Sequence, residues 1–370
     1  MKLLLFIILS LISIRSYSQL NLTVILNKNL DTAKITFFYI DGDVVKFIKP
    51  RFADRTAVIT EPIQSKYARL IINYPDALGR MPGRCFLVSR KKSSLRFNEV
   101  ADTVSNKIAS IKAKNLIDVT NDKVYKEINN YTKKELKEFK KNLELQNSTP
   151  TDSIAKVIEI SYEKLAFKEL EYMSYHGNNY FYFDKFAQEL VPSLMSKHLQ
   201  ELYEFFNTSF SKEIRESYEG KSLKMLLEGN LLVKIGMQSP PFKTTDYKGA
   251  EISSDKLIGK FYLLSFWATW CSPCVAEIPQ LKRIRNLYTS DKLEMISVSC
   301  DADSVKFLNG IDKYKMDWIH IFNKPEITNL FGRKPIPSVY VIDENGKMIF
   351  SSWEKSLDSL EAILNTQMKE

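Results

Sequence analysis

Two cysteines lie three positions apart in the stretch SFWATWCSPC, at Cys271 and Cys274. The other two cysteines of the 370-residue chain, Cys85 and Cys300, are isolated in the sequence. Cysteines at this spacing can form a structural disulfide, supply half of a metal site, or act as a redox centre. Each alternative needs a different setting, so the surrounding residues must distinguish them.

A metal site is disfavoured by the number of available ligands. A structural zinc site needs four ligands, commonly from a second Cys-x-x-Cys or from closely spaced histidines. The chain has no second pair of this kind, and its three histidines, His176, His198 and His320, are isolated. A copper-delivery motif with three residues between its cysteines also fits poorly. We therefore expect neither a metal nor another cofactor.

The position of the pair argues against an inert disulfide. It follows an apolar run at 261–266 and precedes residues with helical spacing, which predicts a strand and then a helix that begins at the cysteines. Unsatisfied N–H groups and the helix dipole at such an N-terminus favour a thiolate at Cys271. A thiolate is the nucleophile in disulfide exchange. We expect the face of this helix to comprise Cys274, Ile278, Leu281, Ile284 and Leu287.

Cys274 lies one turn inside the expected helix, where it would be shielded and could act as the resolving thiol. Pro273 suits the first helical turn, because its missing N–H costs little there. Trp267 is expected in the core, whereas Trp270, beside the nucleophile, is expected to line the active site.

The segment FWATWCSPCVAEIP resembles the active-site segment of thioredoxin-like proteins, and within them the exported TlpA/ResA type. The resemblance covers about residues 233–370 and includes IGMQSPPF and KPIPSVYVIDENGKMIF. It implies a thiol-disulfide oxidoreductase. Ile336-Pro337 matches the family's cis-proline, so both residues would present backbone to the substrate. Ser272 and Pro273, between the cysteines, would tune the redox potential.

Two departures from the minimal thioredoxin pattern affect the site. Ser265 stands six residues before Cys271, where cytoplasmic thioredoxins carry a buried Asp. The TlpA/ResA resemblance then implies Glu277 as the group that moves protons at Cys274, which requires hydrogen-bond reach. The chain between Cys271 and Pro337 is also longer than in a minimal thioredoxin, and a strand-helix insertion around residues 300–331 would account for this.

The remaining pattern predicts four parts. Residues 1–18 have the outline of a signal peptide with cleavage after Ser18. Short alternating runs over 19–97 predict a small antiparallel β-domain. Apolar residues every three or four positions over 98–230 predict a helical region, in which YFYF at 180–183 packs as core. The order of elements over 231–370 predicts an α/β thioredoxin-like domain with a mixed sheet and a hairpin turn at Asn345-Gly346.

The charge pattern adds little specificity. The whole chain has a formal net charge of +9, and the part that follows residue 18 has a net charge of +7. Its Lys and Arg are interleaved with Asp and Glu. Such interleaving is typical of solvated helix faces, so we expect no nucleic-acid partner. No segment is long and apolar enough to predict stable membrane insertion. Cys85 and Cys300 are expected as small buried side chains.

These features predict a periplasmic thiol-disulfide oxidoreductase that acts through Cys271 and Cys274, reductively, on exported proteins with disulfides. A membrane electron donor would reduce it again. Two alternatives are a thiol peroxidase, disfavoured because that family's Thr-x-x-Cys setting is missing, and an envelope binding or assembly protein in which the C-terminal fold is a redox-linked adaptor.

Overall fold

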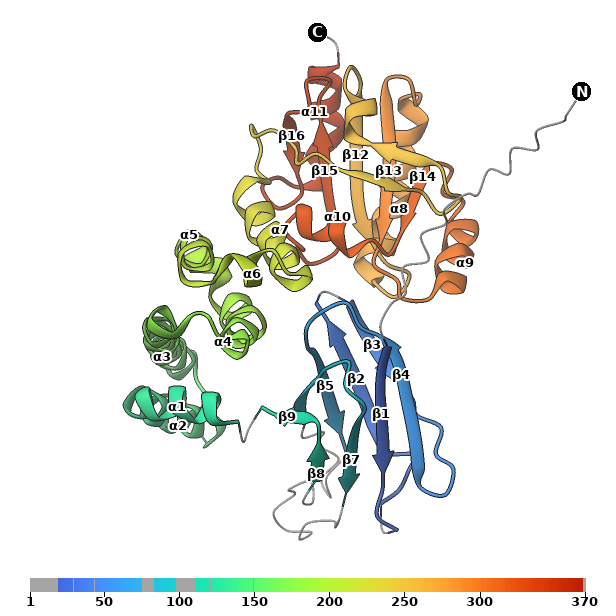
Figure 1. The fold of residues 1–370 in the computed structure, drawn as a ribbon. Helices are drawn as coiled ribbons and strands as arrows, with labels where there is room; N and C mark the ends of the chain where they lie inside the picture. The colour runs from blue at the N-terminus through green and yellow to red at the C-terminus, as the bar shows by residue number, and fades with distance from the viewer. Residues whose placement is uncertain are drawn as a thin grey trace, which may run out of the picture. The chain divides into compact units, whose positions relative to one another are not determined.

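The computed structural model describes residues 19–28, 30–42, 44–74, 83–97, 111–119, 122–148 and 150–368 (Figure 1). The predicted signal peptide and its cleavage point fall at residues 1–18, outside the described residues. The chain forms two compact units, which divide between Glu127 and Ile128.

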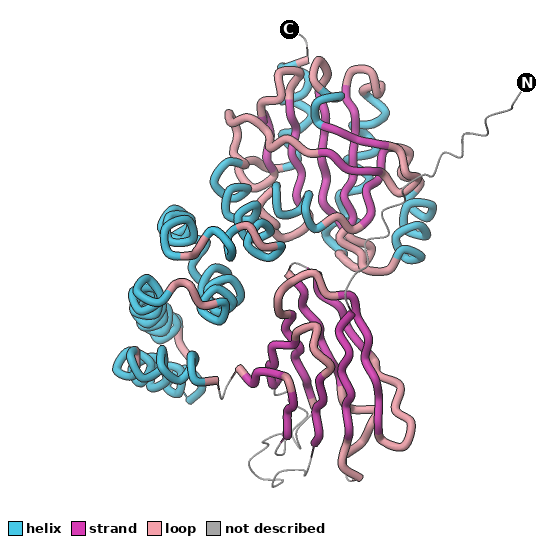
Figure 2. The backbone as a smooth tube through the Cα atoms, in the orientation of Figure 1, coloured by secondary structure: helices cyan, strands magenta, loops and turns pink. Residues whose placement is uncertain are grey.

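The first unit is built from strands, drawn in magenta in Figure 2, that form two sheets. One sheet has the order β4-β1-β7-β8 and the other has the order β3-β2-β5-β6-β9; every pairing is antiparallel except that of β1 with β7. In most of these strands alternate residues enter a shared apolar core, as Leu20, Leu22 and Val24 do in β1. The strands are β1 (Gln19–Ile25), β2 (Thr36–Asp41), β3 (Val44–Ile48), β4 (Thr56–Pro62), β5 (Ala68–Asn73), β6 (Gly83–Val88), β7 (Ser93–Phe97), β8 (Ile111–Lys114) and β9 (Leu116–Asp118).

Two of these strands lie beyond residue 97, where the sequence placed the end of the β-rich part. β8 pairs with β7, and β9 pairs with β6, so both complete sheets whose other strands precede residue 97. Their sequences, IKAK and LID, are too short to show an alternating pattern.

Helices follow and lead into the second unit. Several begin at a side-chain cap that accepts a hydrogen bond from a free helix N–H, such as Thr151 for α3 and Ser217 for α7. Tyr182 and Phe183 of the YFYF run are buried, which confirms core packing for those two residues. The elements are α1 (Lys123–Tyr131), α2 (Lys133–Ser148), α3 (Asp152–His176), α4 (Tyr180–Lys185), the π-helical turn η1 (Phe186–Leu190), α5 (Val191–Ser209), α6 (Lys212–Arg215) and α7 (Tyr218–Leu232).

The last of these helices packs directly on the following fold. Gly229 of α7 has no side chain, and a Cβ there would lie only 2.5 Å from the carbonyl oxygen of Asn329. The amide of Asn230 donates to the carbonyl oxygen of Gly332 at 2.8 Å. Glycine at this position therefore permits the close approach of α7 to α10.

The C-terminal part has the thioredoxin-like fold: a five-stranded mixed sheet in the order β14-β13-β12-β15-β16. β12 pairs in parallel with β13 and antiparallel with β15, and every residue of β12 is buried. The elements are β10 (Lys243–Thr245), β11 (Glu251–Ser253), η2 (Ser254–Leu257), β12 (Phe261–Trp267), α8 (Ser272–Leu287), β13 (Leu293–Ser299), α9 (Ser304–Tyr314), β14 (Ile319–Phe322), α10 (Pro325–Leu330), β15 (Ser338–Ile342), β16 (Met348–Ser351), η3 (Leu357–Ser359) and α11 (Leu360–Gln367).

Two apolar clusters cover the two faces of this sheet. One contains side chains of α8, α9 and α11 and includes both Cys271 and Cys274. The other contains side chains of α10 and of the β10–β11 hairpin. The turn at Asn345-Gly346 connects β15 to β16, as predicted, with Gly346 at a φ of 80°. The segment expected as an insertion, residues 300–331, holds α9, β14 and α10.

Candidate active site

The cysteine pair lies at the start of α8, shortly after the end of β12. Cys271 is the N-cap of α8, and its sulfur accepts a hydrogen bond from the backbone N–H of Cys274 at 3.2 Å. The two cysteines form a disulfide with their Cα atoms 5.3 Å apart. Cys271 is 6% exposed and Cys274 is 2% exposed, so both cysteines are buried and belong to the apolar core beneath α8.

The apolar face of α8 that includes Cys274 is buried at every predicted position except the last, Leu287. Ile278, Leu281 and Ile284 are buried together with Cys274. Leu287 is exposed, contrary to the expectation, because α8 ends there and the chain turns away at Tyr288.

The Ile336–Pro337 peptide bond is cis, as predicted, and lies beside the pair. The sulfur of Cys271 is 3.8 Å from the carbonyl oxygen of Ile336. Residues 65 positions apart in the sequence therefore meet at this point. Backbone groups of the loop before β15 are next to the sulfur that would face a substrate.

The other predicted residues near Cys271 in the sequence differ in their exposure. Trp270 is 67% exposed, and Ser272 and Pro273 are exposed in the first turn of α8. Trp267 is buried, as expected for a core residue. The exposed Trp270 ring, next in sequence to the buried Cys271, offers aromatic surface on which a peptide could pack.

Ser265 stands where cytoplasmic thioredoxins carry a buried Asp, and here it joins a hydrogen-bonded set of uncharged side chains. Its hydroxyl lies 2.6 Å from the hydroxyl of Ser297, which also accepts a hydrogen bond from the Trp318 indole N–H at 2.7 Å. All three side chains are buried. Ser265 therefore belongs to a set of buried hydrogen bonds between uncharged side chains.

Glu277 lies one turn after Cys274 on α8 and is partly buried. Side chains three apart on a helix are neighbours, which places this carboxyl on the same side as Cys274. Burial raises its pKa above that of an ordinary glutamate. Among the described residues its carboxyl has no ion-pair or hydrogen-bond partner, so it is available to exchange protons.

A buried carboxylate that the sequence analysis missed holds the turn before Cys271. Asp301 is 1% exposed and accepts hydrogen bonds from the backbone N–H and the hydroxyl of Thr269, the latter at 2.7 Å. The hydroxyl of Ser299 donates to it at 2.8 Å. Asp301 thus fixes Thr269, two residues before Cys271. Its only sequence signal is its position directly after an apolar strand.

The remaining cysteines are thiols that are only partly buried, where full burial was expected. Cys85 pairs with Ile71 of the neighbouring strand β5. Cys300 follows the end of β13, and burial together with neighbouring Asp301 raises its pKa to about 11. A thiol with such a pKa stays protonated near neutral pH, which makes Cys300 a poor nucleophile.

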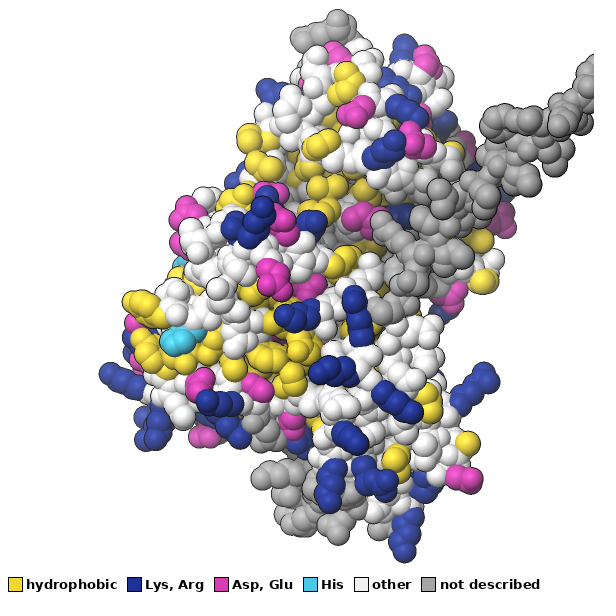
Figure 3. All heavy atoms as spheres, in the orientation of Figure 1, with side chains coloured by type: hydrophobic (Ala, Val, Ile, Leu, Met, Phe, Trp, Pro, Cys, Tyr) yellow, Lys and Arg dark blue, Asp and Glu magenta, His cyan; other side chains and the backbone are white. Residues whose placement is uncertain are grey.

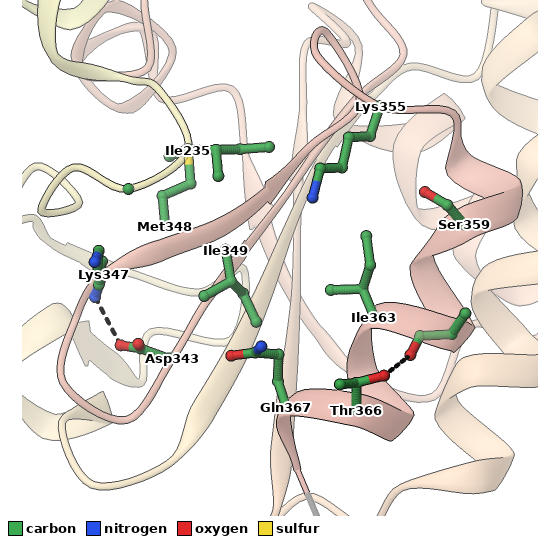
Figure 4. A pocket seen from close by; sticks show the side chains of 12 residues that line it. Ile235, Asp343, Lys347, Met348, Ile349, Lys355, Ser359, Ile363, Thr366 and Gln367 are labelled. Carbon is green, nitrogen blue, oxygen red and sulfur yellow. Dashed lines mark hydrogen bonds between the residues drawn. The ribbon is translucent and has the colours of Figure 1, made fainter.

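Other features of the described residues lie apart from the pair. No three metal-binding side chains gather in the described part of the chain. None of its helices combines the length and apolar character needed to cross a bilayer. A pocket of about 530 Å³ between β16 and α11, with Ile349, Ile363 and Thr366 in its wall, contains none of the predicted site residues (Figure 4).

Comparisons with known proteins agree with this geometry. Residues 235–351 match the AhpC/TSA family, which defines the class of this thioredoxin-like part. Over 118 residues the chain is 30% identical to thiol-disulfide oxidoreductase ResA of Bacillus anthracis, covering 32% of this chain and 68% of that protein. Over 134 residues it is 31% identical to ResA of Bacillus cereus strain ATCC 10987. This match covers 36% of this chain and 78% of that protein. The chain belongs to the ResA-type thiol-disulfide oxidoreductases and is an oxidoreductase.

Solved structures give weaker likenesses over the same part. The thioredoxin domain of a thiol-disulfide oxidoreductase from Bacteroides vulgatus is 22% identical with a TM-score of 0.33, covering 36% of this chain and 98% of that one. A thiol-disulfide oxidoreductase from Bacteroides fragilis is 22% identical with a TM-score of 0.32. This match covers 35% of this chain and 98% of that one.

Proposed function

We propose that this protein is an exported oxidoreductase that exchanges dithiols for disulfides through Cys271 and Cys274, within a thioredoxin-like domain at residues 231–370. The observation that carries the proposal is the disulfide at the N-terminus of α8, with the Ile336 carbonyl oxygen 3.8 Å from Cys271. A helix N-terminus stabilises the thiolate that exchange requires.

In the reduced protein, the Cys271 thiolate accepts the hydrogen bond from the Cys274 N–H and attacks one sulfur of a substrate disulfide. A mixed disulfide forms between Cys271 and the substrate, and the other substrate sulfur leaves as a thiolate. The Cys274 thiolate then attacks the Cys271 sulfur, which releases the second substrate thiol and forms the Cys271–Cys274 disulfide. Two electrons pass from the protein to the substrate.

The neighbouring groups have distinct roles in this scheme. Glu277 accepts the proton of the Cys274 thiol, which must be lost before the resolving step. Trp270 and the backbone of Ile336 and Pro337 hold the substrate chain beside Cys271. Ser272 and Pro273 set the shape of the first helical turn and so influence the stability of the disulfide relative to the dithiol.

Several finer assignments complete the proposal. The protein acts in the periplasm after cleavage behind Ser18, because the N-terminal sequence has the pattern of a signal peptide. Its substrates are exported proteins with disulfides, and a membrane donor of electrons reduces the Cys271–Cys274 disulfide again. A reductive direction fits the resemblance to the ResA-type enzymes.

Replacement of the resolving cysteine tests the mechanism directly. A Cys274→Ser variant keeps the nucleophile but cannot complete the second step. It should therefore accumulate a mixed disulfide with a disulfide-containing peptide, visible by mass spectrometry. The matched control, Cys300→Ser, should complete the cycle and leave no adduct. Absence of an adduct in the Cys274→Ser variant would contradict the proposed attack by Cys271.

A further inference from the structure

A second group of side chains lies beside the cis-proline loop, at the end of β16. Trp353 follows this strand and is 48% exposed. Its indole N–H donates to the hydroxyl of Ser338 at 2.8 Å, and Ser338 directly follows Pro337. The indole ring is therefore fixed next to the loop that contacts Cys271.

Lys334 stands over this ring. Its ammonium nitrogen is 5.9 Å from the centre of the Trp353 ring, within the range of a cation–π interaction. Lys334 lies three residues before Pro337 and is partly buried. The cation is thus held close to the path that a substrate bound at Cys271 would follow.

Two influences act on Lys334, and both disfavour its charged form. Burial and the like charge of Lys234 both lower its pKa. No carboxylate among the described residues forms an ion pair with either lysine. The nearest acid in sequence to Trp353 is Glu354, whose carboxylate accepts a hydrogen bond from the Ile235 N–H at 2.9 Å. A partly buried ammonium next to a second one favours an incoming anion.

We propose that Lys334, Lys234 and Trp353 form a subsite for an acidic side chain of the substrate, close to the substrate's reactive cysteine. The inference rests on the proposed exchange at Cys271 and names the class of substrate. A peptide disulfide-bonded to Cys271 lies beside Ile336, two residues from Lys334. At about 3.3 Å per extended residue, a side chain two or three positions from the substrate cysteine reaches the ammonium group.

A pair of peptides tests the subsite. Both carry one cysteine in a mixed disulfide with a neutral small thiol, and they differ only in Glu or Gln two residues from that cysteine. The reduced wild-type protein, kept reduced by a dithiol, should show a kcat/KM about fivefold higher for the Glu peptide at low ionic strength. Added salt should weaken this preference, since ions screen partly exposed charges.

Charge-removing variants locate the preference. Lys334→Gln should reduce the preference for the Glu peptide over the Gln peptide to about onefold. Lys234→Gln, at an exposed position, should reduce the preference for the Glu peptide only in part. Lys313→Gln is the matched control, because Lys313 also stands over a ring, that of Tyr314 at 5.2 Å, but on α9. It should keep the full preference.

The outcomes separate the two proposals. Equal rates on both peptides in the wild type, or a full preference retained by Lys334→Gln, would overturn the subsite and leave the exchange reaction standing. Failure of the wild-type protein to reduce either peptide would overturn the proposed function, and the subsite with it.

Discussion

The two compact units of this protein differ in what their charges and buried polar groups do. Residues 19–127 contain 19 Lys and Arg against 11 Asp and Glu, a net charge of +8, whereas residues 128–370 contain 32 against 33, a net charge of −1. Dark-blue side chains are prominent over the β-rich unit in Figure 3. The cysteine pair and every residue predicted to serve it lie in the nearly neutral unit.

Each unit nevertheless contains a buried aspartate that holds a turn. In the first unit, Asp41 is 3% exposed and accepts hydrogen bonds from the backbone N–H groups of Gln64 and Ser65 at 2.7 and 2.9 Å. In the second unit, Asp301 does the same for Thr269. A buried aspartate therefore holds a turn apart from the cysteines in one unit and the turn just before Cys271 in the other.

The largest expected difference between the units concerns their cysteines. Cys271→Ser should lower the rate of disulfide exchange on the order of 10³-fold or more, because the attacking group is removed. Cys85→Ser, in the β-rich unit, should leave the rate unchanged. Turnover of a disulfide peptide by the two variants measures this. Comparable losses in both would break the assignment of the chemistry to one unit.

Removal of the Glu277 carboxyl should give the next largest effect. The pKa of Glu277 is raised by burial, so its basic form appears only above the usual range of a glutamate. The rate of the resolving step in the wild type should rise as pH increases through that pKa. Glu277→Gln should lose this rise and slow the step on the order of tenfold to a hundredfold. Stopped-flow measurement of mixed-disulfide decay between acidic and neutral pH would detect it.

The same group affects stability with a defined sign. Because the raised pKa means that folding favours the protonated form, Glu277 supports the folded state below the usual glutamate pKa. That support is lost as pH rises through the raised pKa. Glu277→Gln should therefore become more stable relative to wild type as pH increases. A stability difference that moves in the opposite direction would contradict the burial of this carboxyl.

Replacing the buried aspartates Asp301 and Asp41 should give the smallest effects on exchange, but the two variants should differ clearly from each other. Asp301→Ala and Asp41→Ala should each lower the free energy of unfolding of their unit by about 1–3 kcal/mol, since each leaves buried donors without an acceptor. Urea unfolding measures this loss. Only Asp301→Ala should also slow disulfide exchange, by a few-fold, through the displaced turn. A similar slowing by Asp41→Ala would show that the first unit contributes to the reaction.

Local sequence patterns were sufficient where a feature depends on neighbours in the chain. The run before Cys271 and the spacing after it predicted that Cys271 lies at a helix N-terminus, and the cis bond of Ile336-Pro337 was predicted by family resemblance. Leu287 was placed wrongly because periodicity does not show where a helix leaves the core. Asp301 escaped notice because its partner Thr269 is 32 positions away. Trp353 and Lys334 likewise come together only through the pairing of β15 with β16.

The redox potential of the Cys271–Cys274 pair tests the central claim most directly. It can be measured by equilibrating a Cys85→Ser, Cys300→Ser double variant with dithiol buffers and counting alkylated thiols by mass. An exchange centre should titrate as one two-electron couple between about −270 and −120 mV. A potential below about −300 mV would identify a structural disulfide and contradict the account.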